Sequence, residues 1–263
     1  MNSRPQIEAW IDQTRHPIND AAYQNQRREE FDQLGALVLR RFFSPEFVNR
    51  VVAESADRQS EAFYANSTHN VYLTPPDPRL PEHHAFNRQL VSSKGLIADD
   101  QVPQESPLRD VYGNNQFRGF LCALLGVDSV YPYADELSSI NVHYAPQGRE
   151  LGWHFDNSSF AVTTLLQAPE KGGVFEYVPD VRNSDAGDMA FSRVDAVLNG
   201  TENVFQLEFE PGDLVLFRGR NAMHRVTPTE GSVTRILAVF AYNDEAGIGL
   251  SASALETFYG RAK

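Results

Sequence analysis

The second half of the chain consists of short apolar runs separated by turn signals, and this pattern constrains the fold more than any other feature. Proline and glycine mark the turns at 145–148, 169–173 and 210–213. Short strands joined in this way are typical of a β-sandwich or a barrel. The runs that we predict to be strands are 138–144, 161–167, 173–178, 204–209, 214–217 and 235–242.

The first half of the chain has mainly helical patterns. Ser44-Pro45-Glu46 has the order of an N-cap, a proline in the first helical position and an acid in the first turn. Residues 107–126 are again helical in pattern, whereas 65–110 are predicted to be irregular. The reason is the segment Pro75-Pro76-Asp77-Pro78, which cannot continue a helix or a central strand.

These patterns together predict one α+β domain over residues 1–263. Its core is a double-stranded β-helix, the cupin-like jelly roll, at about 131–245. A helical N-terminal part at about 1–130 packs on this core, and a helical tail follows at 246–263. We find no repeat, linker or low-complexity segment that would divide the chain.

Composition excludes several classes of partner. The net charge of −12 argues against nucleic-acid binding, which depends on Lys and Arg side chains that neutralise phosphates. It also argues, more weakly, against anionic membrane surfaces. The single cysteine, Cys122, excludes an intramolecular disulfide and a cysteine-rich metal cluster. No apolar run approaches a membrane span or a signal core, so we expect a cytoplasmic protein with a small-molecule substrate. The pattern leaves the oligomeric state open.

Three residues indicate a metal centre. His154 and Asp156 are two positions apart, so they share one face if they lie on a strand, and His224 follows seventy positions later. A surface histidine near a surface aspartate would be the ordinary reading of the first pair alone. Two imidazoles and one carboxylate on one face of an octahedral ion leave three open positions, which is typical of non-haem Fe(II) oxygenases. Arg235 lies in an apolar run, where a guanidinium needs an anionic partner such as the carboxylate of 2-oxoglutarate.

The order of these residues resembles the Fe(II)/2-oxoglutarate-dependent dioxygenase superfamily. Its marks here are His-X-Asp, a long gap, Pro211-Gly212-Asp213 before an apolar run, a distal histidine and an arginine about ten residues on. The resemblance covers about 138–243. It implies that His154, Asp156 and His224 bind Fe(II), that Arg235 binds the distal carboxylate of 2-oxoglutarate, and that O2 is the second cosubstrate.

A closer resemblance is to the free amino-acid radical halogenases and their hydroxylase relatives. It rests on 153–157, 165–167 and 172–177, and on Arg88 followed by 92–95. Halogenating members of that branch have glycine in place of the carboxylate ligand, which opens a position for chloride. Because this chain has Asp156, the resemblance implies a hydroxylase that acts on an aliphatic C–H bond of a small polar metabolite, most of all a free amino acid.

Three further residues near the metal pair are candidates for lining the site. Asn141 and Tyr144 are in the strand before it, and either can reach the oxo-acid or simply pack within the sheet. Trp153 either forms a wall of the site or fills the core. His143 neighbours this strand but is predicted not to be a ligand.

Four residues are candidates for substrate binding. Arg88 suits a bidentate clamp on a carboxylate, although a surface arginine would look the same. Glu136 and Asn157 are candidates for holding a substrate amine. The resembled branch has an acid near each position, so the neutral Asn157 puts a lysine-type ammonium in doubt. Tyr259 in the C-terminal tail either closes the pocket or belongs to a frayed end.

Two other functions stay open at this point. An enzyme with the same cofactors can carry out desaturation, cyclisation or halogenation, and only the last is disfavoured by Asp156. A cupin-like metal-binding protein without oxygenase activity is the other alternative, and Arg235 argues against it because such a protein needs no buried carboxylate clamp.

Overall fold

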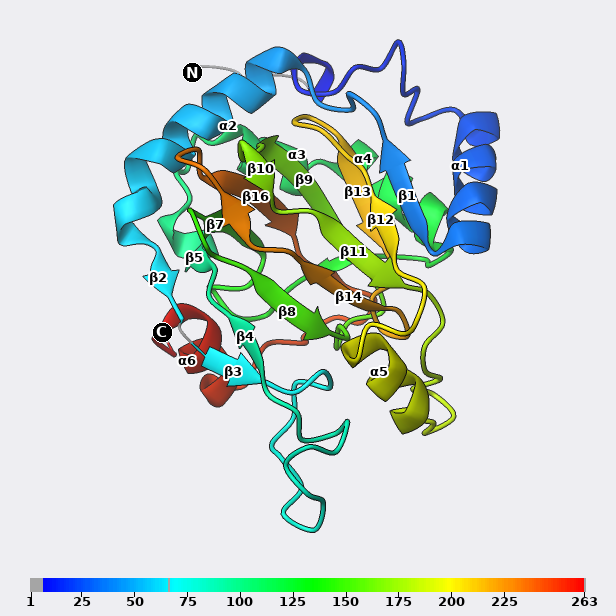
Figure 1. Ribbon diagram of the computed structural model, residues 1–263. Helices are drawn as coiled ribbons and strands as arrows, with labels where there is room; N and C mark the ends of the chain where they lie inside the picture. Colours follow the sequence, from blue (N-terminus) through cyan, green and yellow to red (C-terminus); the bar gives the residue numbers. More distant parts are fainter. Residues whose placement is uncertain (1–6, 66, 263) are drawn as a thin grey trace.

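Two antiparallel sheets form the centre of the molecule (Figure 1). The computed structural model describes residues 7–65 and 67–262. Within these residues the larger sheet has the strand order β1-β13-β9-β16-β7-β5-β2, and the smaller has the order β12-β11-β14-β8-β4-β3. The larger sheet contains β1 (Ala36–Leu39), β2 (Phe63–Tyr64), β5 (Gly95–Ile97), β7 (Ile140–Ala145), β9 (Ala161–Gln167), β13 (Leu214–Phe217) and β16 (Arg235–Phe240). The smaller contains β3 (Ser67–His69), β4 (Leu90–Ser92), β8 (Leu151–His154), β11 (Phe175–Val178), β12 (Phe205–Leu207) and β14 (Met223–Val226).

Short ribbons and helices complete the fold. Strand β10 (Lys171–Gly172) pairs with β15 (Thr229–Glu230), and β6 (Tyr131–Pro132) pairs with β17 (Tyr242–Asn243). The α-helices are α1 (Ala21–Leu34), α2 (Pro45–Arg58), α3 (Pro107–Tyr112), α4 (Asn115–Leu125), α5 (Phe191–Leu198) and α6 (Ala252–Tyr259). Single 3-10 turns lie at Ile7–Ala9, Gln59–Glu61 and Asp99–Gln101. Across the described residues, no helix combines the length and the apolar character that a membrane crossing requires.

Helix α2 begins where the sequence predicts a helix. The Ser44 hydroxyl accepts a hydrogen bond from the backbone N–H of Phe47, and Pro45 occupies the first helical position, where it needs no N–H partner. Phe47 and Val51 lie four residues apart and face the core, where both are fully buried. Burial of this apolar face is what binds the helix to the larger sheet.

The larger sheet has two faces with different roles. Alternate side chains such as Val142 on β7 and Ala238 on β16 point outward and pack with the helices in the main core, which also contains Phe117 and Phe120 of α4. The intervening side chains point inward, between the two sheets. The helices that Figure 1 shows around the larger sheet therefore cover its outer face and leave the inner face for a site.

The prediction of an α+β jelly roll is confirmed, with one correction to its first half. Residues before 130 are only partly helical: they also contribute β1, β2 and β5 to the larger sheet and β3 and β4 to the smaller. Strands β4 and β5 lie within the segment predicted to be irregular. They form because they pair with β8 and β7, which follow them by about fifty residues in the chain. The segment itself carries no local signal for this pairing.

Candidate metal centre

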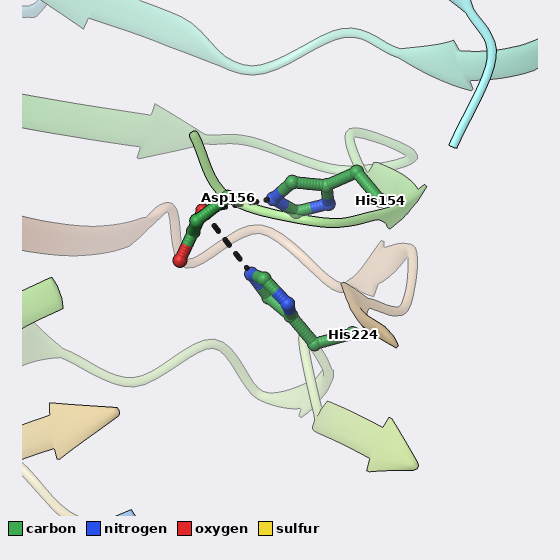
Figure 2. Close-up of side chains that lie close together, drawn as sticks. All are labelled: His154, Asp156 and His224. Atoms are coloured by element: carbon green, nitrogen blue, oxygen red, sulfur yellow. Dashed lines mark ion pairs between the residues drawn. The ribbon is translucent and has the colours of Figure 1, made fainter. Parts of the chain in front are cut away.

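The three predicted ligands lie together at one end of the smaller sheet. His154 ends β8, Asp156 follows two residues later, and His224 lies on β14, where it is the direct cross-strand partner of His154. Figure 2 shows the three side chains pointing toward one another. His154 Nε2 is 3.7 Å and His224 Nε2 is 3.5 Å from Asp156 Oδ1. One ligand atom from each residue lies within 4.8 Å of the others, so a single ion can bind all three.

The backbone fixes the orientation of both imidazoles. His154 Nδ1 lies 2.8 Å from the carbonyl oxygen of Gly152, and His224 Nδ1 lies 3.1 Å from that of Ala222. A carbonyl can only accept, so each Nδ1 carries the proton and each Nε2 presents a lone pair to the metal position. Phe175 also stacks on the His224 ring at a centroid distance of 5.5 Å, which holds this ring against rotation.

The electrostatics of the triad favour its ligand forms. Burial lowers the pKa of His154 to about 3, with the neighbouring His224 acting in the same direction. Burial opposes ionisation of Asp156, but the imidazoles of His224 and His154 and the ammonium of Lys94 outweigh it and lower the pKa of Asp156 to about 2. At neutral pH the carboxylate is therefore ionised and His154 is neutral, as metal binding requires.

The donor set fits iron. Two imidazole nitrogens and one carboxylate oxygen are the protein ligands typical of non-haem Fe(II) centres that keep open positions. Asp156 Oδ2 is buried and has no hydrogen-bond partner among the described residues. A buried anionic oxygen without a partner is costly unless a cation lies nearby, which is a second indication of a metal at this place.

A cavity of about 240 Å³ extends from the triad between the two sheets. Its walls are mostly apolar and include Phe175, Phe217 and Leu237. A concave and largely apolar site with a few polar groups is the usual form of a small-molecule site. The polar and charged residues that line it beside the triad are Lys94, Tyr133, His143, Glu150, Ser158, Thr163, Arg235 and Tyr242.

Arg235 occupies the position that the sequence suggests. It is the first residue of β16, and only 6% of it is exposed. Its Nη2 atom is buried and has no hydrogen-bond partner among the described residues. Burial lowers the pKa of Arg235 to about 10, so the guanidinium is still charged at neutral pH. A carboxylate is the group that would satisfy this buried, unpaired donor.

Lys94 and His143 also face the cavity, and neither was assigned a role from the sequence. Lys94 Nζ donates to His143 Nδ1 at 3.1 Å. Burial lowers the pKa of Lys94 to about 8, partly offset by Asp156. Burial, with Lys94 and Arg235, holds the pKa of His143 well below its usual value. The pair is therefore an ammonium donating to a neutral imidazole at neutral pH.

Strand register explains why Lys94 lies near Arg235. Gly95 pairs with Tyr144, and Arg235 pairs with Ala145 on the other side of the same strand. Lys94 and Arg235 therefore flank the small side chain of Ala145. The signal in the sequence was a lysine directly before a short apolar run, but its partner strand is about fifty residues away.

Two of the residues predicted as candidates for lining the site lie elsewhere. Tyr144 points to the outer face of the larger sheet, where its hydroxyl donates to the Ser55 carbonyl of α2 at 2.9 Å, so its predicted cofactor role does not fit the structure. Trp153 points away from the cavity into a second core cluster, under the Arg225 guanidinium at 4.8 Å, and is not a wall of the site.

Asn141 and Tyr259 are joined by a hydrogen bond on the inner face. Asn141 lies on the same side of β7 as His143, and its side chain donates to the Ser138 carbonyl at 2.8 Å. The Tyr259 hydroxyl of α6 donates to Asn141 Oδ1 at 2.6 Å. The tail is therefore an ordered helix packed at the end of the barrel, but neither residue lines the cavity.

The structure does not bring the other predicted substrate residues to the cavity. Arg88 is held at the end of α5, where it donates to Asn199 Oδ1 at 2.7 Å and to the Leu198 carbonyl at 3.2 Å. Glu136 and Asn157 are exposed on loops. Tyr133, which the sequence did not single out, does line the cavity. Loop residues of this kind carry no periodic signal from which their direction can be predicted.

Comparison with known proteins agrees with this geometry. The family model described as Halogenase D matches residues 19–257. No curated protein matches the chain in sequence.

Solved structures with the same fold include an oxidoreductase of the 2OG-Fe(II) oxygenase family from Burkholderia pseudomallei, with 13% identity over 86% of this chain and 93% of that one (TM-score 0.53). A Pseudomonas putida prolyl-4-hydroxylase is 13% identical over 82% and 98% (TM-score 0.52). HygX from Streptomyces hygroscopicus, solved with nickel, 2-oxoglutarate and hygromycin B bound, is 16% identical over 86% and 89% (TM-score 0.54).

These findings confirm the predicted superfamily and the predicted pair of iron and 2-oxoglutarate. The fold is that of the iron and 2-oxoglutarate oxygenases, the triad is assembled, and the family model covers most of the chain. The chain is thus an iron and 2-oxoglutarate-dependent oxygenase that belongs to the Halogenase D family.

Proposed function

We propose that this protein hydroxylates an aliphatic C–H bond of a small polar metabolite, and that a free amino acid is its substrate. The observation that supports hydroxylation most is the carboxylate of Asp156, whose Oδ1 atom lies 3.5–3.7 Å from both histidine ligand atoms. In the halogenating relatives that the sequence resembles, glycine leaves this position free for a halide. Here the carboxylate fills it.

The residues that line the cavity would have different roles in such a reaction. His154, Asp156 and His224 would hold the iron, which when bound supplies oxidation by O2 coupled to conversion of 2-oxoglutarate to succinate and CO2. Arg235 would hold the distal carboxylate of 2-oxoglutarate, with Lys94 as a second positive charge beyond Ala145. The apolar walls would exclude water and orient the target C–H bond. The balance is R–H plus 2-oxoglutarate and O2 to R–OH plus succinate and CO2.

The size and charge of the cavity favour a small polar substrate. A cavity of about 240 Å³ must hold both 2-oxoglutarate and the target group of the substrate. Among the described residues, Tyr133, Glu150 and Ser158 are lining groups that the triad and the two cations leave available for polar contacts. A carboxylate and a hydroxyl can accept from a substrate ammonium, which supports the amino-acid class.

Halogenation is the second candidate, and the description of the family favours it. Against it stands Asp156, because a carboxylate ligand leaves one open position fewer at the metal. The two reactions consume the same cosubstrates, so only the product distinguishes them.

The test is a panel of free amino acids incubated with the protein, Fe(II), 2-oxoglutarate and ascorbate in chloride buffer. We expect one class of amino acid to raise succinate formation, with a product heavier by one oxygen. Asp156→Ala, handled in the same way, is the matched control. A product in which chlorine replaces hydrogen would contradict hydroxylation. No stimulation by any amino acid would contradict the substrate class.

A further inference from the structure

Gly219 lies directly against the carboxylate of the triad. It belongs to the segment between β13 and β14, and its carbonyl accepts a hydrogen bond from the backbone N–H of Asp156 at 3.0 Å. A β-carbon on Gly219 would lie 2.6 Å from Asp156 Cγ and 2.9 Å from His224 Cε1, and it would overlap Asp156 Oδ2. Real β-carbons essentially never come within 3.0 Å of a heavy atom outside their own residue and its chain neighbours. Any other residue here would displace the Asp156 carboxylate.

Space, rather than backbone conformation, requires glycine at this position. Gly219 is not among the glycines with positive φ, such as Gly212 and Gly126. An alanine would therefore adopt the same backbone without strain. The cost of adding a methyl group falls on the neighbouring ligands, mainly on Asp156 and to a smaller extent on His224, which makes Gly219→Ala a test of space.

The carboxylate has little freedom to move away. Its backbone is held by the hydrogen bond to the Gly219 carbonyl, and Oδ1 faces the two imidazoles. Figure 2 shows the second oxygen pointing away from the imidazoles, and this Oδ2 is the atom that a Gly219 side chain would meet. Oδ2 is buried and has no hydrogen-bond partner among the described residues. The bare backbone of Gly219 is thus the far wall of the carboxylate position.

We propose that Gly219 is a positioning residue that reserves the space beside the metal for one anionic group. In the natural chain that group is the Asp156 carboxylate. In an Asp156→Gly protein the same space would be open to a free monovalent anion such as chloride or azide, and a methyl group at position 219 would close it again. The inference rests on the metal assignment of the proposed function.

The first test is a double-mutant cycle read by metal binding. The four proteins are the natural chain, Gly219→Ala, Asp156→Gly and the double variant, each titrated anaerobically with Co(II) and followed by visible absorption. We expect Gly219→Ala to weaken Co(II) binding about 10–100-fold, as loss of a supporting group commonly does. In the Asp156→Gly background the same change should have a much smaller effect, because no carboxylate remains to displace and only the 2.9 Å contact with His224 Cε1 is left.

The matched control is Gly119→Ala. Gly119 is exposed on α4, and a β-carbon there would meet nothing within 4 Å. It should bind Co(II) like the natural protein. If Gly219→Ala does so too, with an unchanged spectrum, or if the two effects simply add in the double variant, the proposal is overturned. Failure of the natural protein to bind Co(II) or Fe(II) at all would instead overturn the proposed function.

The second test uses azide as the probe anion on the Co(II)-loaded Asp156→Gly protein. We expect azide to change its visible spectrum and expect no change in the double variant, where the methyl group fills the space. This experiment also covers the case in which Gly219→Ala fails to fold, because the double variant lacks the overlap with the Asp156 carboxylate. Equal azide responses in the two proteins would contradict the assigned role.

Discussion

Arg235 and Lys94 show how single residues determine the chemistry of the cavity. Both side chains are cations at neutral pH. Of the two, only the Lys94 side chain forms a hydrogen bond within the described residues, and it donates this bond to the neutral His143. Two positive charges on either side of Ala145 destabilise the cavity without an anion and favour a bound carboxylate. We therefore expect these two side chains to set the affinity for 2-oxoglutarate.

Arg235→Gln should raise the 2-oxoglutarate concentration needed for half-maximal succinate formation. Loss of a charge-assisted partner in a buried site costs on the order of 2–5 kcal/mol, which is at least about a thirtyfold rise. The measurement is succinate formation as a function of 2-oxoglutarate. Arg15→Gln, at an exposed site, is the control and should leave the curve unchanged. An unaltered requirement in Arg235→Gln would place the clamp elsewhere.

We expect Lys94 to make 2-oxoglutarate binding depend on pH. Its pKa of about 8 means that the ammonium loses its proton as pH rises through that value, while Arg235 remains charged until about 10. Affinity for 2-oxoglutarate should therefore fall between pH 7 and 9. Lys94→Gln should bind more weakly at pH 7 but show a flat profile, as measured by anaerobic titration of the metal-loaded protein. A natural protein with the same flat profile would refute this role.

The lowered pKa of Lys94 also affects the free energy of unfolding. This quantity changes with pH in the direction opposite to the affinity for 2-oxoglutarate. Between the folded pKa of about 8 and the ordinary value of 10.5, the unfolded chain binds the proton and the folded chain does not. The contribution of Lys94 to the free energy of unfolding therefore rises with pH in this window. Lys94→Gln removes this contribution, so the variant and the natural protein should differ in the slope of stability against pH from 8 to 10.

Alternate residues of strand β7 line the cavity on one face of the larger sheet and pack against a helix on the other. His143 and Ala145 face the cavity, and Tyr144 between them faces α2. The sequence left either Asn141 or Tyr144 as a candidate for contact with the oxo-acid. Because they are three residues apart on one strand, alternation places them on opposite faces. Which face is the inner one depends on the pairing of β7 with β5 and β16, which local patterns do not contain.

Tyr144→Phe tests this separation. The hydroxyl is buried and donates to the Ser55 carbonyl, so its loss should lower the free energy of unfolding by about 1–2 kcal/mol. The 2-oxoglutarate requirement should stay the same, because the residue lies on the outer face. Urea denaturation and a cosubstrate titration measure the two quantities. A raised requirement with unchanged stability would reverse the assignment.

Some strands could be predicted from local sequence patterns alone, and others could not. The runs at β9 and β13 were predicted with their observed bounds, because both are short and apolar and each has a proline-containing turn beside it. The triad and Arg235 were predicted because ligand chemistry restricts both residue type and order. Strands β4, β5 and β8 were missed, since they are short and partly polar and form only through distant partners. The role of Lys94 was missed with them.

For the whole molecule, the site joins parts of the chain that are far apart in sequence. His154 and His224 come from neighbouring strands of the smaller sheet, whereas Arg235 belongs to the larger sheet. A metal with 2-oxoglutarate would therefore connect both sheets, and binding to the folded state alone adds stability by mass action.

Loading with Mn(II) and 2-oxoglutarate should raise the thermal midpoint of unfolding. At ligand concentrations of about 100 times the dissociation constant the gain is about 2.7 kcal/mol. His224→Ala should lose the shift due to the metal, and Arg235→Gln should keep the metal shift but lose most of the further rise on adding 2-oxoglutarate. Scanning calorimetry measures each step. An equal rise in His224→Ala would show that the metal binds elsewhere.

The alternation of inward and outward side chains in the larger sheet also affects which positions can vary during evolution. Inward positions such as Leu237 and Val239 can change while outward neighbours such as Ile236 and Ala238 keep the helices in place. Substrate preference can then drift by point substitutions at every second residue without loss of the scaffold. A one-residue insertion in β7 or β16 would exchange both sets at once, so we expect natural variation in these strands to consist of substitutions and length changes to be confined to the loops.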